Sequence, residues 1–150
     1  MDRPDLYSEL LALNADYWAR VDVTVDDPID MLFTEDGRMA IGTGLDLRGR
    51  EAIRSFFDKR NAEQAAAGRR TRHVHTNLYV EPLGADRAKA RSMIVVFAGV
   101  GALPLPASAP TTIADVEDIC VRGPDGRWRF ETRMLQPIFI GAGAAGFVKS

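Results

Sequence analysis

Both histidines of the chain lie in one short segment, Arg72 to Val80, whose alternating composition is typical of a β-strand. Alternate side chains of a strand point to the same face, so one face would carry His73, His75, Asn77 and Tyr79. Imidazole changes its charge near neutral pH, and histidines that face an enclosed cavity are therefore candidates for proton transfer. The same alternation also fits an ordinary half-exposed strand with a solvated polar face. The two interpretations differ in which face of the strand contacts solvent.

A histidine base works best when a carboxylate holds its second ring nitrogen, because the carboxylate fixes the tautomer and stabilises the imidazolium. The candidate carboxylates lie near the end of the first predicted helix, just beyond it, or on the third of four long predicted strands: Asp16, Asp22, Asp26, Asp27, Asp115, Glu117 and Asp118. Asp22 comes directly after the apolar stripe of that helix and could lie at the mouth of a cavity. As one acidic residue among several, it could equally be a solvated surface group.

Metal binding is an alternative use of the pair His73 and His75. Glu81 falls on the His73 face by alternation, and a further ligand could come from Asp115 or Glu117. Three leading helices do not suit the small β-barrels that use such ligand sets, so we expect no metal and no cofactor. The single cysteine, Cys120, lies in an apolar strand and is expected to be a core residue.

The elements that must position these residues are predicted from hydrophobic periodicity. Apolar residues at steps of three and four predict a first helix, with Leu6, Leu10, Leu13, Tyr17 and Val21 on one stripe. Asp27-Pro28 begins a second, short helix that carries Met31, Leu32 and Phe33, and residues 50–67 form a third. Strands are predicted at 38–42, 71–81, 88–99, 111–122 and 127–139.

We therefore expect one α+β domain over residues 1–150, with a core from about 6 to 139 and a mobile glycine-rich tail over 140–150. Three N-terminal helices would pack in a curved, mostly antiparallel sheet and enclose a pocket in a cone-shaped fold. Beside the histidine strand, the residues expected to contact a substrate there are Tyr17, Trp18, Phe33, Met39, Phe57, His75, Asn77, Phe97 and Phe130.

Composition and charge limit the kinds of binding partner that we expect for this protein. The chain has 19 basic and 21 acidic residues, for a net charge of −2, and no basic stripe that would favour nucleic acid or an anionic membrane. One cysteine excludes an internal disulfide. The sequence carries no signal-peptide pattern and no long apolar run, so we expect a cytoplasmic protein.

Several segments together resemble the SnoaL-like branch of the nuclear transport factor 2-like superfamily. They are Ala15 to Asp22, Leu32 to Gly37, Leu47 to Ile53, Arg70 to His73, Thr76 to Leu78 and Gly126 to Phe130. The resemblance is to the branch of scytalone dehydratase and hexachlorocyclohexane dehydrochlorinase, and it implies an Asp–His dyad made of Asp22 and His73. It also implies a catalytic arginine at Arg133, which strict alternation would place on one face with Arg129 and Glu131.

This chain departs from both enzymes of that branch. The dehydrochlorinase has a catalytic lysine near the position of Tyr17, and scytalone dehydratase has a tyrosine at the position of Val21. Neither specific reaction is therefore carried over.

The leading functional hypothesis is a cofactor-independent dehydratase, cyclase or isomerase that removes a proton from a small hydrophobic molecule. His73 would be the base, and His75, Asn77 or Tyr17 would hold a substrate oxygen. The alternative is a non-catalytic ligand-binding module, or an assembly protein similar to the β subunit of ring-hydroxylating dioxygenases. An outer sheet face with Val74, Leu78 and Val80 predicts a homo-oligomer, either a dimer or a trimer.

Overall fold

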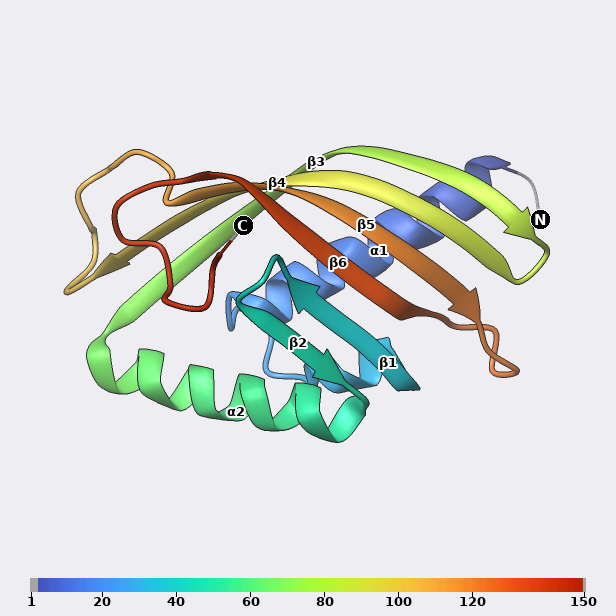
Figure 1. Ribbon diagram of the computed structural model, residues 1–150, viewed down its shortest axis with the longest axis horizontal. Coiled ribbons are helices and arrows are strands. Elements are labelled where there is room, and N and C mark those ends of the chain that lie inside the picture. The colour runs from blue at the N-terminus through green and yellow to red at the C-terminus, as the bar shows by residue number, and fades with distance from the viewer. Residues whose placement is uncertain (1–2, 150) are drawn as a thin grey trace.

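A curved sheet covers two helices that lie on the same side of it (Figure 1). The computed structural model describes residues 3–149, which form helices α1 (Arg3–Val21) and α2 (Arg50–Ala67) and a 3-10 turn, η1 (Ile29–Leu32). The strands are β1 (Phe33–Ile41), β2 (Leu45–Arg48), β3 (Arg69–Gly84), β4 (Arg87–Val100), β5 (Thr112–Arg122) and β6 (Trp128–Ile140). They are ordered β2-β1-β6-β5-β4-β3, and every pair is antiparallel except β1 with β6. The α+β class and the curved, mostly antiparallel sheet are confirmed.

The apolar stripe of α1 faces the core as predicted. Leu6, Leu10, Leu13, Tyr17 and Val21 are all less than 9% exposed. Helix α2 ends at Gly68, which adopts the left-handed conformation (φ 64°) and donates its backbone N–H to the carbonyls of Gln64 and Ala65. A glycine suits this position because it has no Cβ to clash there.

The prediction of three N-terminal helices is not confirmed. The expected second helix is the four-residue turn η1, and Pro28 before it is extended, with ψ at 121°. Phe33, predicted on that helix, instead begins β1 and is completely buried. Burying this large ring against the sheet outweighs the weak helical preference of a short segment, since most helical stability in proteins comes from packing. Strand β2, four residues long, was not predicted.

One residue reverses the alternation of β3. Asn77 has a φ of 57°, and the register with β4 shifts between Thr76 and Tyr79. Such a bulge turns the following side chains to the opposite face. The side chain of Tyr79 is therefore 55% exposed, and Val80 is buried in the core instead of on the predicted outer face. Val74, before the bulge, does lie on the outer face and is 51% exposed.

Residues 141–149, here called the C-terminal strap, return from β6 to the β1–β2 connection (Figure 1). The N–H of Gly141 bonds to the carbonyl of Thr111, and the N–H of Thr43 bonds to the carbonyl of Lys149. The rings of Phe147 and Phe56 meet edge to face, with centroids 5.2 Å apart. The segment expected as a mobile tail is thus packed in the structure.

Within residues 3–149, neither helix combines the length and the apolar character needed to cross a lipid bilayer.

We expect Gly44→Ala to loosen the C-terminal strap, because a Cβ at position 44 would collide with the carbonyl oxygen of Phe147. Exchange of the Val148 amide hydrogen should accelerate at least about tenfold, equivalent to a local loss of about 1.4 kcal/mol. Gly146→Ala is the matched control, since nothing lies within 4 Å of the added Cβ. Equal exchange rates in both variants would show that the strap does not depend on this close approach.

Candidate active site

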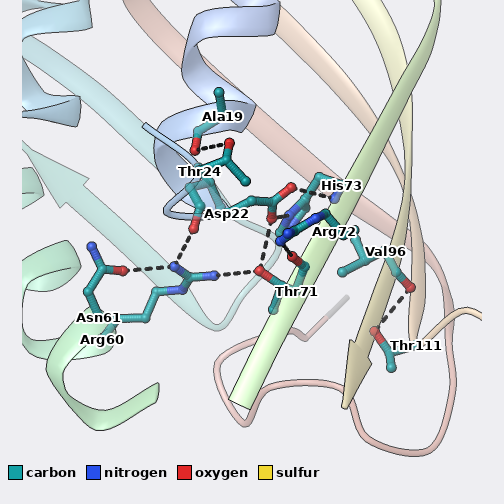
Figure 2. A network of polar contacts seen from close by, with 11 residues as sticks. Ala19, Asp22, Thr24, Arg60, Asn61, Thr71, Arg72, His73, Val96 and Thr111 are labelled. Atoms are coloured by element: carbon teal, nitrogen blue, oxygen red, sulfur yellow. Dashed lines mark hydrogen bonds and ion pairs between the residues drawn. The ribbon is translucent and has the colours of Figure 1, made fainter. Parts of the chain in front are cut away.

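The centre of the site is the carboxylate of Asp22, the first residue after α1 (Figure 2). Its Oδ1 lies 2.6 Å from Nδ1 of His73 and accepts a hydrogen bond of 2.9 Å from the hydroxyl of Thr71. Its Oδ2 accepts the backbone N–H of His73, also at 2.9 Å. Thr71 and His73 are alternate residues of β3, so the strand presents both donors to the end of the helix.

This geometry fixes the chemistry of the histidine ring. Asp22 is an acceptor for Nδ1–H, which leaves Nε2 of His73 with its lone pair free to accept a proton. The side chains of His73 and Asp22 are only 10% and 7% exposed. Burial alone would raise the pKa of the Asp22 carboxyl, but the hydrogen bonds and charge of His73 and the hydroxyl of Thr71 outweigh it and lower this pKa.

Trp18 holds the plane of the imidazole. The two rings are stacked, with centroids 4.7 Å apart and an angle of 15° between their planes. Trp18 lies four residues before Asp22, one helical turn away, so a single helix end provides both the carboxylate and the stacking ring. Rotation of the His73 ring would break the stack and the Nδ1 hydrogen bond together.

Arg60 of α2 joins the three elements of the site (Figure 2). Its NH1 donates to the carbonyl of Val21 at 2.8 Å and to Oδ1 of Asn61 at 3.0 Å, and its NH2 lies 3.5 Å from Oγ1 of Thr71. A cation at the end of α1 satisfies a carbonyl with no partner in the helix and complements the helix dipole. Burial lowers the pKa of this guanidinium.

A largely apolar cavity opens beside His73. The cavity holds about 680 Å³ of empty space, counted out to its open mouth. Four of the residues predicted to contact substrate line it: Tyr17, Trp18, Met39 and Phe57. Sequence reasoning missed Phe56, Arg60, Arg69, Thr71 and, from the C-terminal strap, Phe147. The alternation that selected His73 also places Arg69 and Thr71 on its face of β3, and that signal was available.

Other predicted contact residues lie away from the cavity. Phe33 and Phe130 are completely buried in the core behind Tyr17, at centroid distances of 6.1 and 5.6 Å from its ring. His75 is half-buried on the inner face of β3 and is not among the described lining residues. Asn77 is exposed at the bulge, and Phe97 is 38% exposed in a shallow groove beside the β4–β5 loop.

Arg133 is buried one layer behind the cavity wall. Its guanidinium carbon lies 4.2 Å from the ring centre of Tyr17 and 5.0 Å from that of Trp18. NH2 donates to Oδ1 of Asn14 at 2.7 Å, and Nε lies 3.5 Å from Asp118, an ion pair without a hydrogen bond. Burial raises the pKa of Asp118 to about 6.

Strict alternation would have placed Arg133 with Arg129 and Glu131, but a register shift between β5 and β6 reverses the face. Arg133 is therefore fully buried, and the rings of Tyr17 and Trp18, which line the cavity, lie against its guanidinium.

The alternative of a metal site at His73 and His75 lacks support. Across the described part of the chain, no three His, Cys, Asp or Glu side chains come together as metal ligands. Cys120 is buried in β5, and burial raises the pKa of its thiol, as expected for a core residue.

We expect Thr71→Val to weaken the fold in a pH-dependent way. The folded-state pKa of Asp22 lies below its usual value of 3.8, so its stabilising contribution is present above that value and is lost as pH falls through the folded pKa. Removing the Thr71 hydroxyl should cost about 1–3 kcal/mol at pH 7 and less near pH 3. Urea unfolding at both pH values measures this, with Thr71→Ser as the control that keeps the hydroxyl. An equal loss at both would contradict the assignment.

Comparison with known proteins relates the chain to a domain family and to solved structures of the same fold. A sequence profile of the SnoaL-like domain matches residues 3–134. A search among curated proteins found no significant match. ActVI-ORFA from Streptomyces coelicolor is 20% identical, with a TM-score of 0.78 over 91% of this chain and 98% of that one.

Two further solved structures agree in fold. A protein from Catenulispora acidiphila, solved in complex with S-DNPA, is 23% identical, with a TM-score of 0.73 over 90% and 95% of the two chains. A scytalone dehydratase-like protein from Novosphingobium aromaticivorans is 19% identical, with a TM-score of 0.71 over 92% and 93%. At these identities the structures share the fold, and the profile match assigns the family: the chain belongs to the SnoaL-like domain family.

Proposed function

We propose that this protein is an enzyme that removes a proton from a carbon of a small hydrophobic molecule, in a dehydration, cyclisation or isomerisation. The observation that carries the proposal is the 2.6 Å contact between Asp22 and Nδ1 of His73 at the wall of an apolar cavity. A free Nε2 at such a wall is the arrangement that general-base catalysis requires. The proposed steps need no cofactor.

In this mechanism Nε2 of His73 accepts the proton, and Asp22 stabilises the imidazolium that forms. The carboxylate is already paired and hydrogen-bonded, so little has to rearrange during the proton transfer. A positioned base of this kind contributes about 10²–10⁴-fold to the rate. The apolar wall strengthens the attraction between imidazolium and carboxylate, because the local dielectric constant is lower than in water.

Tyr17 is the best-placed donor for a substrate oxygen. Tyr17 lines the cavity, and its hydroxyl donates to Sδ of Met39 at 3.4 Å, a weak acceptor that a substrate oxygen could replace. Burial raises the pKa of Tyr17 to about 12, so the phenol stays protonated at neutral pH and can donate. The exposed Asn77 is poorly placed for this role.

We expect His73→Ala to abolish catalysis in a protein that still folds, because the backbone N–H of residue 73 and the hydroxyl of Thr71 still bind the Asp22 carboxylate. The assay is deuterium exchange of the acidic C–H protons of 2-tetralone in D₂O, followed by proton NMR. The variant should lose about 10²–10⁴-fold of the enzymatic rate. His75→Asn is the control, because His75 shares the strand face and lies outside the cavity lining. No exchange above the buffer rate in the wild-type protein would favour the non-catalytic binding module, and undiminished exchange by a folded His73→Ala variant would rule out His73 as the base.

We also propose that the protein forms a homo-oligomer through the outer face of its sheet. Val74, Val95, Ile113 and Phe139 are successive partners across β3, β4, β5 and β6. They form an apolar row in which Val74 and Phe139 are 51% and 65% exposed. Burying such a row against a second copy would remove apolar surface from water.

A substitution in this apolar row tests the assembly directly. Val74→Glu should shift the protein to a monomer in light scattering coupled to size-exclusion chromatography, because it would bury a charge in the contact. Ala66→Glu, which adds the same charge to an exposed position of α2 outside the sheet, is the control for charge alone. A monomeric wild-type protein would rule out this assembly.

A further inference from the structure

The lining of the cavity carries an unbalanced charge. Arg60 and Arg69 both line it, and among its described lining residues there is no aspartate or glutamate. The polar partners of Arg60 are Val21, Asn61 and Thr71, all neutral, and NH2 of Arg69 donates to the carbonyl of Gly143 at 2.9 Å. Neither guanidinium forms an ion pair within residues 3–149.

Asp22 offsets this charge only in part. Both of its oxygens are already engaged, Oδ1 by His73 and Thr71 and Oδ2 by the backbone of His73. Its negative charge attracts Arg60, while the positive charge of Arg69 repels Arg60. Counting Asp22 as −1 and the two arginines as +2, this end of the cavity has one uncompensated positive charge while His73 is neutral.

The two arginines converge from different elements. Arg60 extends from α2, and Arg69 is the first residue of β3, on the same face as Thr71 and His73 by alternation. Arg69 lies four residues before His73 on the extended strand, a span of about 13 Å. Arg60 reaches Thr71, halfway along that span. Both basic groups thus lie on the Arg69 side of the candidate base, and Arg60 is the nearer of the two to it.

We infer that the α2–β3 end of the cavity is an anion subsite, and that the substrate carries a carboxylate bound there by Arg60 and Arg69. This inference rests on the proposed function of the same cavity. The apolar body of the substrate lies along Trp18 and Phe57, with its acidic C–H at His73. Arginine suits this role because its planar donors match the two oxygens of a carboxylate.

The test compares the binding of 2-naphthoate with that of 2-naphthamide, a neutral molecule of nearly the same shape, by isothermal titration calorimetry. We expect the wild-type protein to bind naphthoate about tenfold or more tightly than the amide, because charge-assisted hydrogen bonds are the stronger ones. Arg69→Gln should remove most of that preference and leave the affinity for the amide unchanged.

Arg70→Gln is the matched control, since it removes the same charge from the next residue, which is exposed and absent from the described cavity lining. It should keep the preference for naphthoate. Arg60→Gln, checked for folding by its melting temperature because Arg60 also binds the end of α1, should lose the preference like Arg69→Gln. Equal affinities for the two probes in the wild-type protein, no binding of naphthoate, or an unchanged preference in Arg69→Gln would overturn the inference.

These measurements need no turnover, so they separate the two proposals. A naphthoate preference that depends on Arg69, together with no tetralone exchange above the buffer rate in the wild-type protein, would leave the anion subsite standing in a protein that only binds ligands. Loss of exchange in His73→Ala with no naphthoate preference would leave the enzyme and remove the subsite.

Discussion

The site depends on the requirement that a buried carboxylate have partners for its oxygens. Asp22 meets it with donors from one strand, the ring and backbone of His73 and the hydroxyl of Thr71. An unpaired buried charge costs several kcal/mol, so the end of α1 and the start of β3 must keep their positions relative to each other. Arg60 extends this constraint to α2. The contacts that hold the fold together here are therefore the contacts that orient the ring of His73.

Residues with strictly local patterns could be predicted from the sequence. The apolar stripe of α1 and the shared strand face of His73 and His75 follow from periods of 3.6 and two residues, whereas the period alone left open which face is buried. The pairing of Asp22 with His73 could not be derived in this way, because 51 residues separate them in the chain. Spacing left Asp22 as one of several acidic residues, and the family resemblance singled it out.

The failures arise where one extra residue breaks the period. Asn77 in β3 and the register shift beside Arg133 in β6 each turn a side chain to the face opposite to the expected one. A bulge depends on cross-strand pairing, which the residues of one strand do not reveal. The segment of η1 also differs from its predicted structure. It forms a short turn instead of a helix because the ring of Phe33, which follows it, is buried in the core.

The C-terminal strap has a consequence for how this cavity could change its ligand. Most of the cavity wall belongs to the sheet and helices, where a new side chain must fit a packed core on its other side. Phe147 and Val148 contribute wall from a segment joined to the rest by a small number of hydrogen bonds and one aromatic contact. A change of side chain there would alter the binding space without replacing a residue of the sheet or of either helix.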